Sequence, residues 1–508
     1  MRLSKELLPV LDGKKDIQAP VEDHLRLPEK VLQFGTGVLL RGLPDYFIDK
    51  ANKTGLFNGR IVVVKSTGKG TTDAFAEQDG LYTQCIRGIE DGQAKQENIL
   101  NAAISRVLSA ATQWQEILQC AENPAMEIVI SNTTEVGITL TDDDVHAVPP
   151  VSYPGKLLAF LYRRYEYFKG SADKGMVIIP TELIPDNGRK LRDIVLELAA
   201  SNNLPEAFIR WLSSANHFCN SLVDRIVPGA LPAAEQQEME AALGYEDALM
   251  IMSEVYRLWA IETTDAGVKE RLGFAAADKG VVLAPNINVF RELKLRLLNG
   301  THTLSCGLAF LAGFDTVQAA MEAPDMEAAI TALMMEEMAP AITDIYITET
   351  AATQFAASVL DRFRNPHIAH QWLSITMQYT SKMKMRNVPV LLRHYQRSQE
   401  APHWISLGFA AYLLFMRSER GADGAFKGTV NGETYTIQDD HASWFYEQWK
   451  RLEPSVLVKE VLANTALWGT DLTLLKGFAP AVNNMLQQLL QHGAKAVVEN
   501  FNHANAGK

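Results

Sequence analysis

The stretch that decides the fold is Lys30-Val-Leu-Gln-Phe34-Gly35-Thr36-Gly37-Val38-Leu39-Leu40-Arg41-Gly42. It begins with an apolar run of strand length and continues, after two glycines, into a helical pattern. Gly35 and Gly37 stand where a tight turn and a close approach of the backbone to a pyrophosphate require glycine, at the N-terminus of a helix. We therefore expect a strand–turn–helix unit that binds a dinucleotide through Gly35, Thr36, Gly37, Val38, Leu39, Leu40 and Arg41.

Two residues of this stretch modify the usual dinucleotide fingerprint. Leu40 occupies its third position, where glycine or alanine is usual, so the helix is expected to lie slightly farther from the sheet. Arg41 is expected to add a fork of hydrogen-bond donors to the phosphates. A glycine turn that binds no nucleotide is the alternative interpretation.

The second apolar run, residues 60–64, ends in Lys65-Ser66-Thr67. An enzyme that uses NAD usually carries Asp or Glu here for the ribose hydroxyls. Lys65 would attract the 2′-phosphate of NADP, whereas Ser66 and Thr67 would serve the ribose of NAD. A lysine at a solvated strand end is the third interpretation, so this segment leaves the choice between NAD and NADP open.

Three more continuous apolar runs follow, at residues 127–130, 176–179 and 280–283, with helical patterns such as 191–200 between them. Continuous runs are typical of a parallel sheet that is covered on both faces. The alternation predicts an α/β domain over residues 1–285, with a Rossmann-type, doubly wound sheet. Asn132 follows one run at the carboxyl edge, where it is expected to face the nicotinamide; a helix cap is the alternative.

After about residue 290 the strand signal almost vanishes, and apolar residues recur at helical spacing. The pattern predicts an all-helical domain over residues 286–508. Residues 429–430 and 434–437, around Asn431-Gly432, are expected to form one hairpin within it. The expected helices cover residues 326–338, 351–363, 372–382, 404–416, 442–451 and 473–490.

Composition limits the classes of partner. The chain has 508 residues and a net charge of −12, which disfavours nucleic acid, and it lacks the roughly 18–20 consecutive apolar residues of a membrane helix. Four widely separated cysteines support neither a metal site nor a disulfide framework. With no signal-peptide pattern at the N-terminus, we expect a cytoplasmic protein.

The segment Lys294-Leu-Arg-Leu-Leu-Asn299-Gly-Thr-His302 combines three polar groups. On one regular helix, at roughly 100° per residue, Asn299 would lie about 140° and His302 about 80° from Lys294. An ammonium, an amide and an imidazole within one arc suit the reduction of a carbonyl group. Three solvated side chains on a helix surface are the alternative.

This segment resembles the catalytic helix of the mannitol dehydrogenase family, the polyol-specific long-chain dehydrogenases. The stretch Phe218–Pro228, with Val-Asp-Arg-Ile at its centre, is similar to that family's signature. Residues 259–262 and 184–188 resemble family segments in the same order. Together with the glycine turn, the resemblance extends from about residue 28 to 400, and residues 33–41 resemble most the branch that acts on hexuronates.

The resemblance implies an NAD-linked, metal-free oxidoreductase that reversibly reduces the ketone of a hexuronate, with a Rossmann domain and a helical C-terminal domain. It implies that Lys294 is the general acid/base and that Asn299 and Asn187 stabilise the oxyanion. His302 would bind and orient the substrate. Family members that act on neutral polyols, an epimerase or isomerase with a tightly held cofactor, and a non-catalytic dinucleotide sensor are the alternatives.

Several cations would suit a sugar-acid substrate. Mannitol dehydrogenases carry a glutamate at the position of Arg291, so a different proton path is expected here, and Arg291 would assist an anionic substrate. Lys382 and Arg386 are four residues apart and are our candidates for binding the carboxylate. A solvated basic helix end is the alternative for this pair. The sequence does not decide the oligomeric state.

Overall fold

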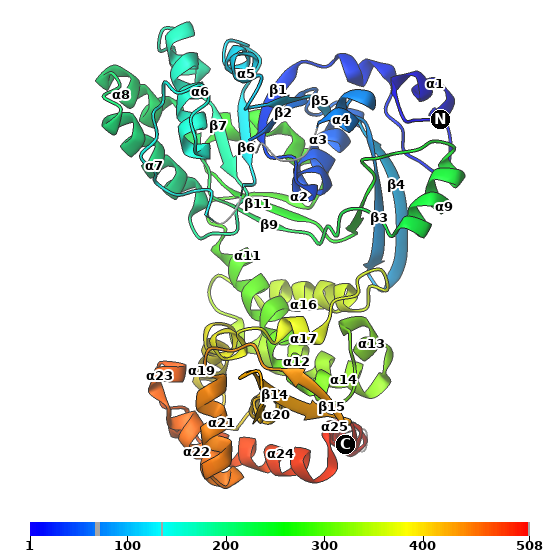
Figure 1. The fold of residues 1–508 in the computed structure, drawn as a ribbon, viewed down its shortest axis with the longest axis vertical. Helices are drawn as coiled ribbons and strands as arrows, with labels where there is room; N and C mark the ends of the chain where they lie inside the picture. The colour runs from blue at the N-terminus through cyan, green and yellow to red at the C-terminus, as the bar shows by residue number, and fades with distance from the viewer. Residues whose placement is uncertain (67–71, 134–135, 506–508) are drawn as a thin grey trace. The chain divides into compact units, whose positions relative to one another are not determined.

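The computed structural model describes residues 1–66, 72–133 and 136–505, and its chain forms two compact units (Figure 1). The first comprises Met1–Gly88 and Ala94–Ile287, and the second comprises Ile89–Gln93 and Asn288–Lys508. The boundary between the two units follows Ile287, two residues beyond the domain boundary expected after residue 285. The short segment Ile89–Gln93 belongs to the second unit, which the sequence did not indicate.

The first unit is built on a six-stranded sheet in which all neighbouring strands are parallel. Four of the predicted apolar runs are strands of this sheet. The fifth run forms β12 (Val281–Ala284), which belongs to a different, three-stranded sheet, so its expected place was wrong. In spatial order the six strands are β5 (Ile104–Ser109), β2 (Arg60–Lys65), β1 (Glu29–Phe34), β6 (Ile128–Ser131), β7 (Val177–Pro180) and β8 (His217–Phe218).

Alternate side chains of these strands enter two separate cores, which explains the continuous apolar runs. Leu32, Val62 and Val129 pack against helices α5–α8 on one face, which lie together beside the sheet in Figure 1. Val31 and Val63 pack on the other face, against α3 and against the two three-stranded sheets of this unit. The helices of this unit are α1 (Leu8–Leu11), α2 (Val38–Gly42), α3 (Pro44–Lys53), α4 (Asp73–Glu77), α5 (Trp114–Cys120), α6 (Tyr153–Tyr167), α7 (Asn187–Ser201), α8 (Glu206–Ala215), α9 (Ala233–Leu243) and α10 (Ala266–Arg271).

Two three-stranded sheets complete the first unit, in the orders β10-β3-β4 and β12-β11-β9. Most of their strands escaped the sequence analysis because they are short or, like β4, largely exposed and polar. Their bounds are β3 (Tyr82–Glu90), β4 (Gln93–Asn101), β9 (Ser221–Asp224), β10 (Ile251–Glu254) and β11 (Leu258–Glu262).

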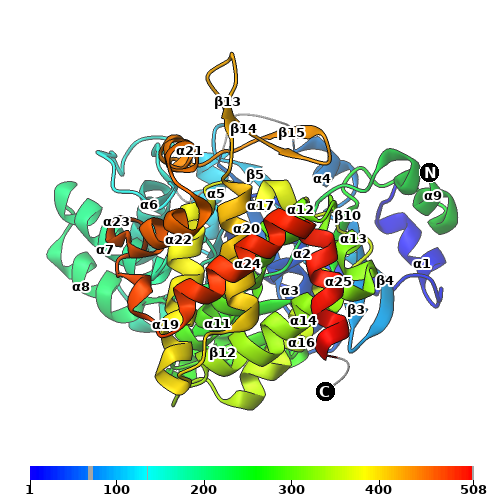
Figure 2. The same ribbon diagram turned by 90° about the horizontal axis from the view of Figure 1, so that it is seen from below.

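The second unit is mainly helical, as expected. Helix α20 (His403–Phe415) is buried almost all round and packs against α12 (Gly300–Leu311) and α24 (Phe478–His492), which Figure 2 shows beside it. Its other helices are α11 (Asn288–Leu293), α13 (Val317–Glu322), α14 (Pro324–Ala332), α15 (Ala339–Ile342), α16 (Glu349–Phe363), α17 (Trp372–Ile375), α18 (Tyr379–Lys382), α19 (Val388–Arg397), α21 (Ala442–Arg451), α22 (Pro454–Ala463), α23 (Thr465–Trp468) and α25 (Ala494–Asn505).

Two expectations for this unit need correction, and a third is confirmed with an addition. The predicted helix 372–382 is broken into α17 and α18, because Gln378 adopts a left-handed conformation with φ 51°. The helix predicted from residue 473 begins only at Phe478, after Gly477 with φ 77°. The hairpin is confirmed as β14 (Phe426–Val430) and β15 (Glu433–Thr436), and β13 (Glu419–Arg420) adds an unexpected third strand.

In the described part of the second unit, three π-helical segments interrupt the helices: Lys294–Asn299, Leu333–Met338 and Met383–Asn387. The first contacts both of the others. A π-helical turn is rare and is found often at functional sites. Two of the three segments contain residues that the sequence analysis singled out.

No helix in the described ranges is both long and apolar enough to cross a membrane.

A buried carboxyl group lies next to the glycine turn. The Gln33 side-chain amide donates to Asp45 Oδ2 at 3.4 Å and to the main-chain oxygen of Gly35 at 3.5 Å. Within the described residues, Asp45 Oδ1 and Gln33 Oε1 are buried without a hydrogen-bond partner. Burial raises the pKa of Asp45 to about 8.

The raised pKa of Asp45 predicts how stability depends on pH. The folded protein holds this proton up to about pH 8, whereas the unfolded chain loses it near its ordinary value of 3.8. Stability should therefore fall as pH rises from about 4 to 8 and level off above that range. Asp45→Asn keeps the acceptor for Gln33 and offers a donor to Gln33 Oε1, so it should raise the melting temperature at pH 8.5 more than at pH 5.

The matched control is Asp49→Asn, which removes an ion pair with Lys53 on the same helix. It should lower the melting temperature and leave the fall with pH in place. Between pH 5 and 8.5, the melting temperature of the wild type should change more than that of Asp45→Asn. If it does not, the buried carboxyl group is not neutral in the folded protein.

Candidate active site

The glycine turn joins β1 to α2 in a conformation that needs Gly35. Its φ is +128°, and a Cβ placed there would lie 2.9 Å from the main-chain oxygen of Asn132 and 2.8 Å from Leu40 Cδ1. Gly37, which precedes α2, has extended angles, and a Cβ placed there would have no neighbour within 4 Å. Gly35 is therefore needed for packing, whereas Gly37 leaves open space at the start of the helix. Gly37 is exposed at this space, and Thr36, Val38 and Leu39 are half-buried around it.

Leu40 and Arg41 turn into the protein. Leu40, at the third position of the fingerprint, is fully buried against Gly35. The close contact that a small residue would make at that position is made instead by Gly42, where a Cβ would lie 2.8 Å from Val227 Cγ2. Arg41 Nη1 donates to the main-chain oxygen of Leu249 at 2.6 Å. Its guanidinium packs on aromatic rings of the interior. The side chain of Arg41 thus points into the unit, with Nη1 bound to a main-chain oxygen and Nε buried without a partner in the described chain, and its expected contact with a phosphate stays a prediction.

At the end of β2, Lys65 is buried and the Ser66 hydroxyl is buried without a partner among the described residues. Thr67 lies outside the described residues. At the end of β6, the Asn132 side-chain amide donates to Thr181, to Oγ1 at 2.9 Å and to the main-chain oxygen at 3.1 Å. Asn132 therefore ties the ends of β6 and β7 together, and its main chain forms the wall behind Gly35.

The three segments 184–188, 218–228 and 259–262 meet through hydrogen bonds. Asn187 donates to the main-chain oxygens of Pro180, Glu182 and Ser221, each at 3.0 Å. Its Oδ1 accepts from the amides of Gly188 and Ser221. Every polar atom of the Asn187 side chain is thus occupied by the main chain. In this structure the Asn187 amide has no donor left for a substrate, and its expected oxyanion role stays a prediction.

Arg225, at the centre of the family-like signature, braces the helix that follows the glycine turn. It is buried, and Nη1 donates to the main-chain oxygen of Gly42 at 2.7 Å while Nε donates to that of Glu254 at 2.9 Å. Its guanidinium packs over the ring of Tyr46 at 4.6 Å. Burial lowers its pKa to about 10. The signature therefore fixes the far end of α2 and, through it, the turn.

In the second unit, Lys294 and Asn299 begin and end a π-helical segment. The regular helix of the sequence analysis, with its angles of about 140° and 80°, was therefore wrong. Both residues are half-buried. The main-chain oxygen of Asn299 accepts from Thr303 Oγ1 at 2.8 Å, whereas no described residue forms a hydrogen bond with its side-chain amide.

His302 follows in α12 and is held by aromatic rings. It stacks on Phe363 with ring centroids 4.2 Å apart, and it meets His370 edge-on at 5.1 Å and Trp372 at 6.0 Å. Burial lowers its pKa well below the ordinary value, and the charges of His370, Arg362 and Arg386 act in the same direction. His302 is therefore a neutral imidazole at physiological pH.

Lys382 and Arg386 lie near this histidine. Lys382 Nζ donates to the main-chain oxygen of Ile375 at 2.9 Å. Arg386 Nη1 donates to Thr303 Oγ1 at 3.0 Å, and Arg386 Nε is buried without a partner in the described chain. Burial lowers the pKa of both cations, and the charge of Arg386 lowers that of Lys382 further. Arg386 therefore keeps donor capacity for a ligand.

We call the three cations Lys382, Arg386 and Arg362, together with the adjacent imidazoles of His302 and His370, the cation cluster. The positive charge of Lys382 lowers the pKa of His370, as Arg386 and Arg362 lower that of His302. Within the described ranges, no salt bridge joins Lys382 or Arg386 to a carboxylate. On Lys382 and Arg386, partly desolvated positive charge without a carboxylate partner in the described chain favours an anionic ligand.

The carboxylate of Glu292, two residues before Lys294, is bound by two arginines. Glu292 accepts from Arg296 Nε at 3.1 Å and from Arg393 Nη2 at 3.4 Å. Arg291, expected to assist the substrate, donates from Nη1 to Asn288 Oδ1 at 2.6 Å. In the described ranges, no group of three or more His, Cys, Asp and Glu side chains could hold a metal ion.

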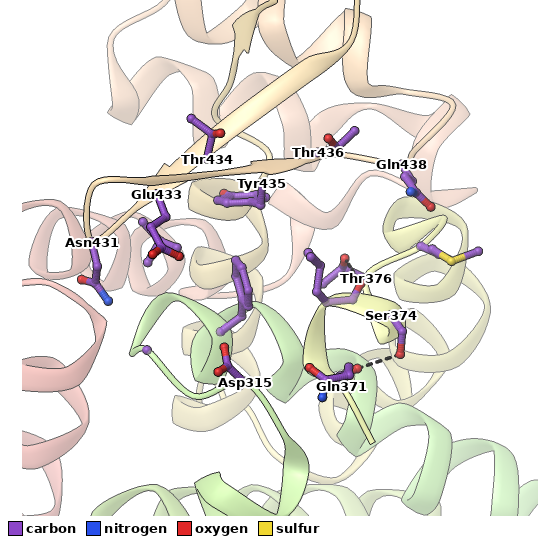
Figure 3. Close-up of a pocket in the computed structure, with 15 residues that line it drawn as sticks. Asp315, Gln371, Ser374, Thr376, Asn431, Glu433, Thr434, Tyr435, Thr436 and Gln438 are labelled. Carbon is purple, nitrogen blue, oxygen red and sulfur yellow. Dashed lines mark hydrogen bonds between the residues drawn. The ribbon is translucent and has the colours of Figure 1, made fainter. Parts of the chain in front are cut away.

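A separate cavity of about 910 Å³ lies in the second unit between β14–β15, the end of α12 and residues 371–377 (Figure 3). Asp315 and Glu433 contribute carboxylates to its lining, which contains no Lys, Arg or His among the described residues. Lys294 and the members of the cation cluster do not line it. Its charge is opposite to that of the cation cluster, so it suits a different kind of ligand.

Comparisons with known proteins identify the family. The model of the mannitol dehydrogenase Rossmann domain matches residues 29–272, and that of the mannitol dehydrogenase C-terminal domain matches residues 286–490. The chain belongs to the mannitol dehydrogenase family. It is therefore an oxidoreductase that acts on a CH–OH group.

Curated relatives cover nearly the whole chain. Altronate oxidoreductase of Bacillus subtilis (strain 168) is 38% identical over 487 residues, which are 95% of this chain and 97% of the relative. That of Klebsiella pneumoniae (strain 342) is 38% identical over 93% of this chain and 96% of the relative. The fold is similar to Pseudomonas fluorescens mannitol 2-dehydrogenase, in a ternary complex with NAD and D-mannitol (23% identity, TM-score 0.65, 99% and 100% coverage). A substrate-free D-sorbitol dehydrogenase has 20% identity, a TM-score of 0.73, and 98% and 100% coverage.

Several residues of this candidate site were not predicted from the sequence. Thr303 and Arg296 are close in sequence to predicted residues. No sequence pattern shows that Arg296 binds a main-chain oxygen or that Thr303 accepts from Arg386. His370 shows no motif spacing. The run of cations at residues 382–386 was the one available signal for the cation cluster.

The glycine turn gives a prediction for two matched variants. Gly35→Ala should destabilise the protein by about 1–3 kcal/mol, because its Cβ meets a main-chain oxygen and its φ is unfavourable for alanine. Gly37→Ala meets open space and should change the free energy of unfolding by less than about 0.5 kcal/mol. Chemical denaturation of both variants measures the difference. Equal stability of the two would contradict the described turn.

Proposed function

We propose that this chain reversibly reduces the ketone of a hexuronate, tagaturonate to altronate, with NAD as its cofactor. The observation that carries the proposal is the cation cluster beside Asn299 and Lys294, because it suits a substrate that bears a carboxylate. The curated relatives named altronate oxidoreductase support it. Fructuronate, a neutral ketose and a sugar phosphate are the competing substrates, and an epimerase with a retained nicotinamide is the competing reaction.

The first unit fits a nicotinamide dinucleotide. Open space at Gly37, the required turn at Gly35 and the unpartnered hydroxyl of Ser66 would receive its phosphates and ribose. Asn132 shapes this site with its main chain. Lys65 is buried, which favours NAD over a cofactor with a 2′-phosphate. When bound, the reduced cofactor supplies the hydride.

Lys294, Asn299 and His302 perform the proton chemistry in this proposal. Protonated Lys294 donates its proton to the substrate oxygen during reduction, and neutral Lys294 accepts it during oxidation. The side-chain amide of Asn299 has donors to stabilise negative charge on that oxygen, whereas those of Asn187 are spent. Neutral His302 orients a substrate hydroxyl. The reaction uses no metal ion.

Arg386 and Lys382 hold the substrate carboxylate. Arg386 retains an unpartnered Nε, and a guanidinium matches the geometry of a carboxylate. Arg291 is engaged with Asn288 and has a lesser part. Because the four cysteines are free thiols in buried positions, we place the enzyme in the reducing cytoplasm.

Removal of the Lys294 amine tests the reaction. Lys294→Ala should lower kcat for NADH-dependent reduction of tagaturonate by about 10²–10⁴-fold, because general acid–base catalysis contributes that much. The matched control is Lys384→Ala, an exposed lysine that donates to the main-chain oxygen of Ala466. Initial rates with NADH and with NADPH measure both variants. Retention of activity within a few-fold in Lys294→Ala would refute the assigned mechanism, and turnover without added nicotinamide would select the epimerase.

A substrate panel tests the carboxylate site. Arg386→Met should raise KM for tagaturonate by about tenfold or more, the effect of losing one charge-assisted hydrogen bond. Its effect on fructose should be smaller, because fructose has no carboxylate. The panel comprises tagaturonate, fructuronate, fructose and fructose phosphate. An equal loss on charged and neutral substrates would exclude Arg386 from carboxylate binding.

A further inference from the structure

Two π-helical segments of the second unit are joined by reciprocal arginines. Arg296, in Lys294–Asn299, donates from Nη1 to the main-chain oxygens of Met385 at 2.5 Å and Arg386 at 3.2 Å. Arg386, in Met383–Asn387, donates from Nη1 toward the main-chain oxygen of Asn299 at 3.5 Å and to Thr303 Oγ1 at 3.0 Å. Each arginine thus binds the main chain of the other segment.

The side chain of Arg296 is held in place by burial and by hydrogen bonds. It is only 9% exposed, and the rest of its guanidinium meets the Glu292 carboxylate from Nε at 3.1 Å and from Nη2 at 3.3 Å. Arg393, from α19, contacts the same carboxylate at 3.4 Å. Glu292 therefore orients the guanidinium of Arg296. That guanidinium in turn fixes the main chain from which the Arg386 side chain extends.

A second contact keeps the two segments close. The Asn387 amide donates to the main-chain oxygen of Gly300 at 2.9 Å, and a Cβ on Gly300 would lie 3.2 Å from that nitrogen. Side chains of each segment thus donate hydrogen bonds to main-chain oxygens in or next to the other segment. Satisfying buried carbonyl groups in this way gives the pair a single relative position.

We propose that Arg296 is a positioning residue that sets the Arg386 guanidinium at a fixed separation from Lys294, and so selects an anionic ketone by the distance between its carboxylate and its carbonyl group. The inference rests on the proposed function, in which Arg386 binds the carboxylate and Lys294 protonates the oxygen. Arg296 itself touches neither group of the substrate. Its effect is transmitted through the main chain of Met385 and Arg386.

A double-mutant cycle on kcat and KM for tagaturonate tests this role with wild type, Arg296→Met, Arg386→Met and the double variant. Arg296→Met should raise KM about tenfold and change kcat less than about threefold, because it displaces a binding group and leaves Lys294 in place. In the Arg386→Met background, Arg296→Met should have no further effect on KM. Arg296→Lys, which keeps the charge beside Glu292, should show the same pattern more weakly.

Arg393→Met is the matched control, since Arg393 contacts Glu292 but not the main chain of Met385 or Arg386. It should leave KM within about twofold of wild type. Additive losses in the cycle, or a loss in kcat rather than KM, would overturn the inference. Should Arg296→Met fail to fold, Arg296→Lys carries the same cycle. A wild-type enzyme without activity on tagaturonate would instead refute the proposed function.

Discussion

Main-chain carbonyl groups that accept hydrogen bonds from side chains of another segment are the constraint on which the candidate site depends. A π-helical turn disturbs the regular helical pairing, and a buried carbonyl group that loses its partner is costly. In the second unit the carbonyl groups of Asn299, Gly300, Met385 and Arg386 receive donors from Arg386, Asn387 and Arg296. Lys294 and the cation cluster are thereby fixed to a common framework.

The first unit uses the same device around the glycine turn. Arg225 and Gln84 both donate to the carbonyl group of Gly42, and Asn132 and Asn187 use their amides on the main chain near β7. The side chains committed in this way are structural. In the proposed site, Ser66, Asn299 and Arg386 have polar atoms without a partner in the described chain, and we assign these atoms to ligands.

The sequence predicted the parts of the fold that depend on local pattern. Continuous apolar runs identified four strands of the main sheet, and Asn431-Gly432 identified the hairpin, because periodicity and turn chemistry act over a few residues. It did not predict β4, whose side chains are mostly exposed, or the π-helical segments, which retain the apolar spacing of a helix. The resemblance named Asn187 and the fingerprint named Arg41, yet both side chains are bound to distant main chain, which no local pattern reveals.

The most direct test of the account is a crystal structure of the enzyme with the oxidised cofactor and altronate. The account predicts the altronate carboxylate within about 3 Å of a guanidinium nitrogen of Arg386, and the reacting hydroxyl within about 3 Å of Lys294 Nζ. A carboxylate bound away from Arg386, or a reacting hydroxyl that contacts a group other than Lys294, would contradict it.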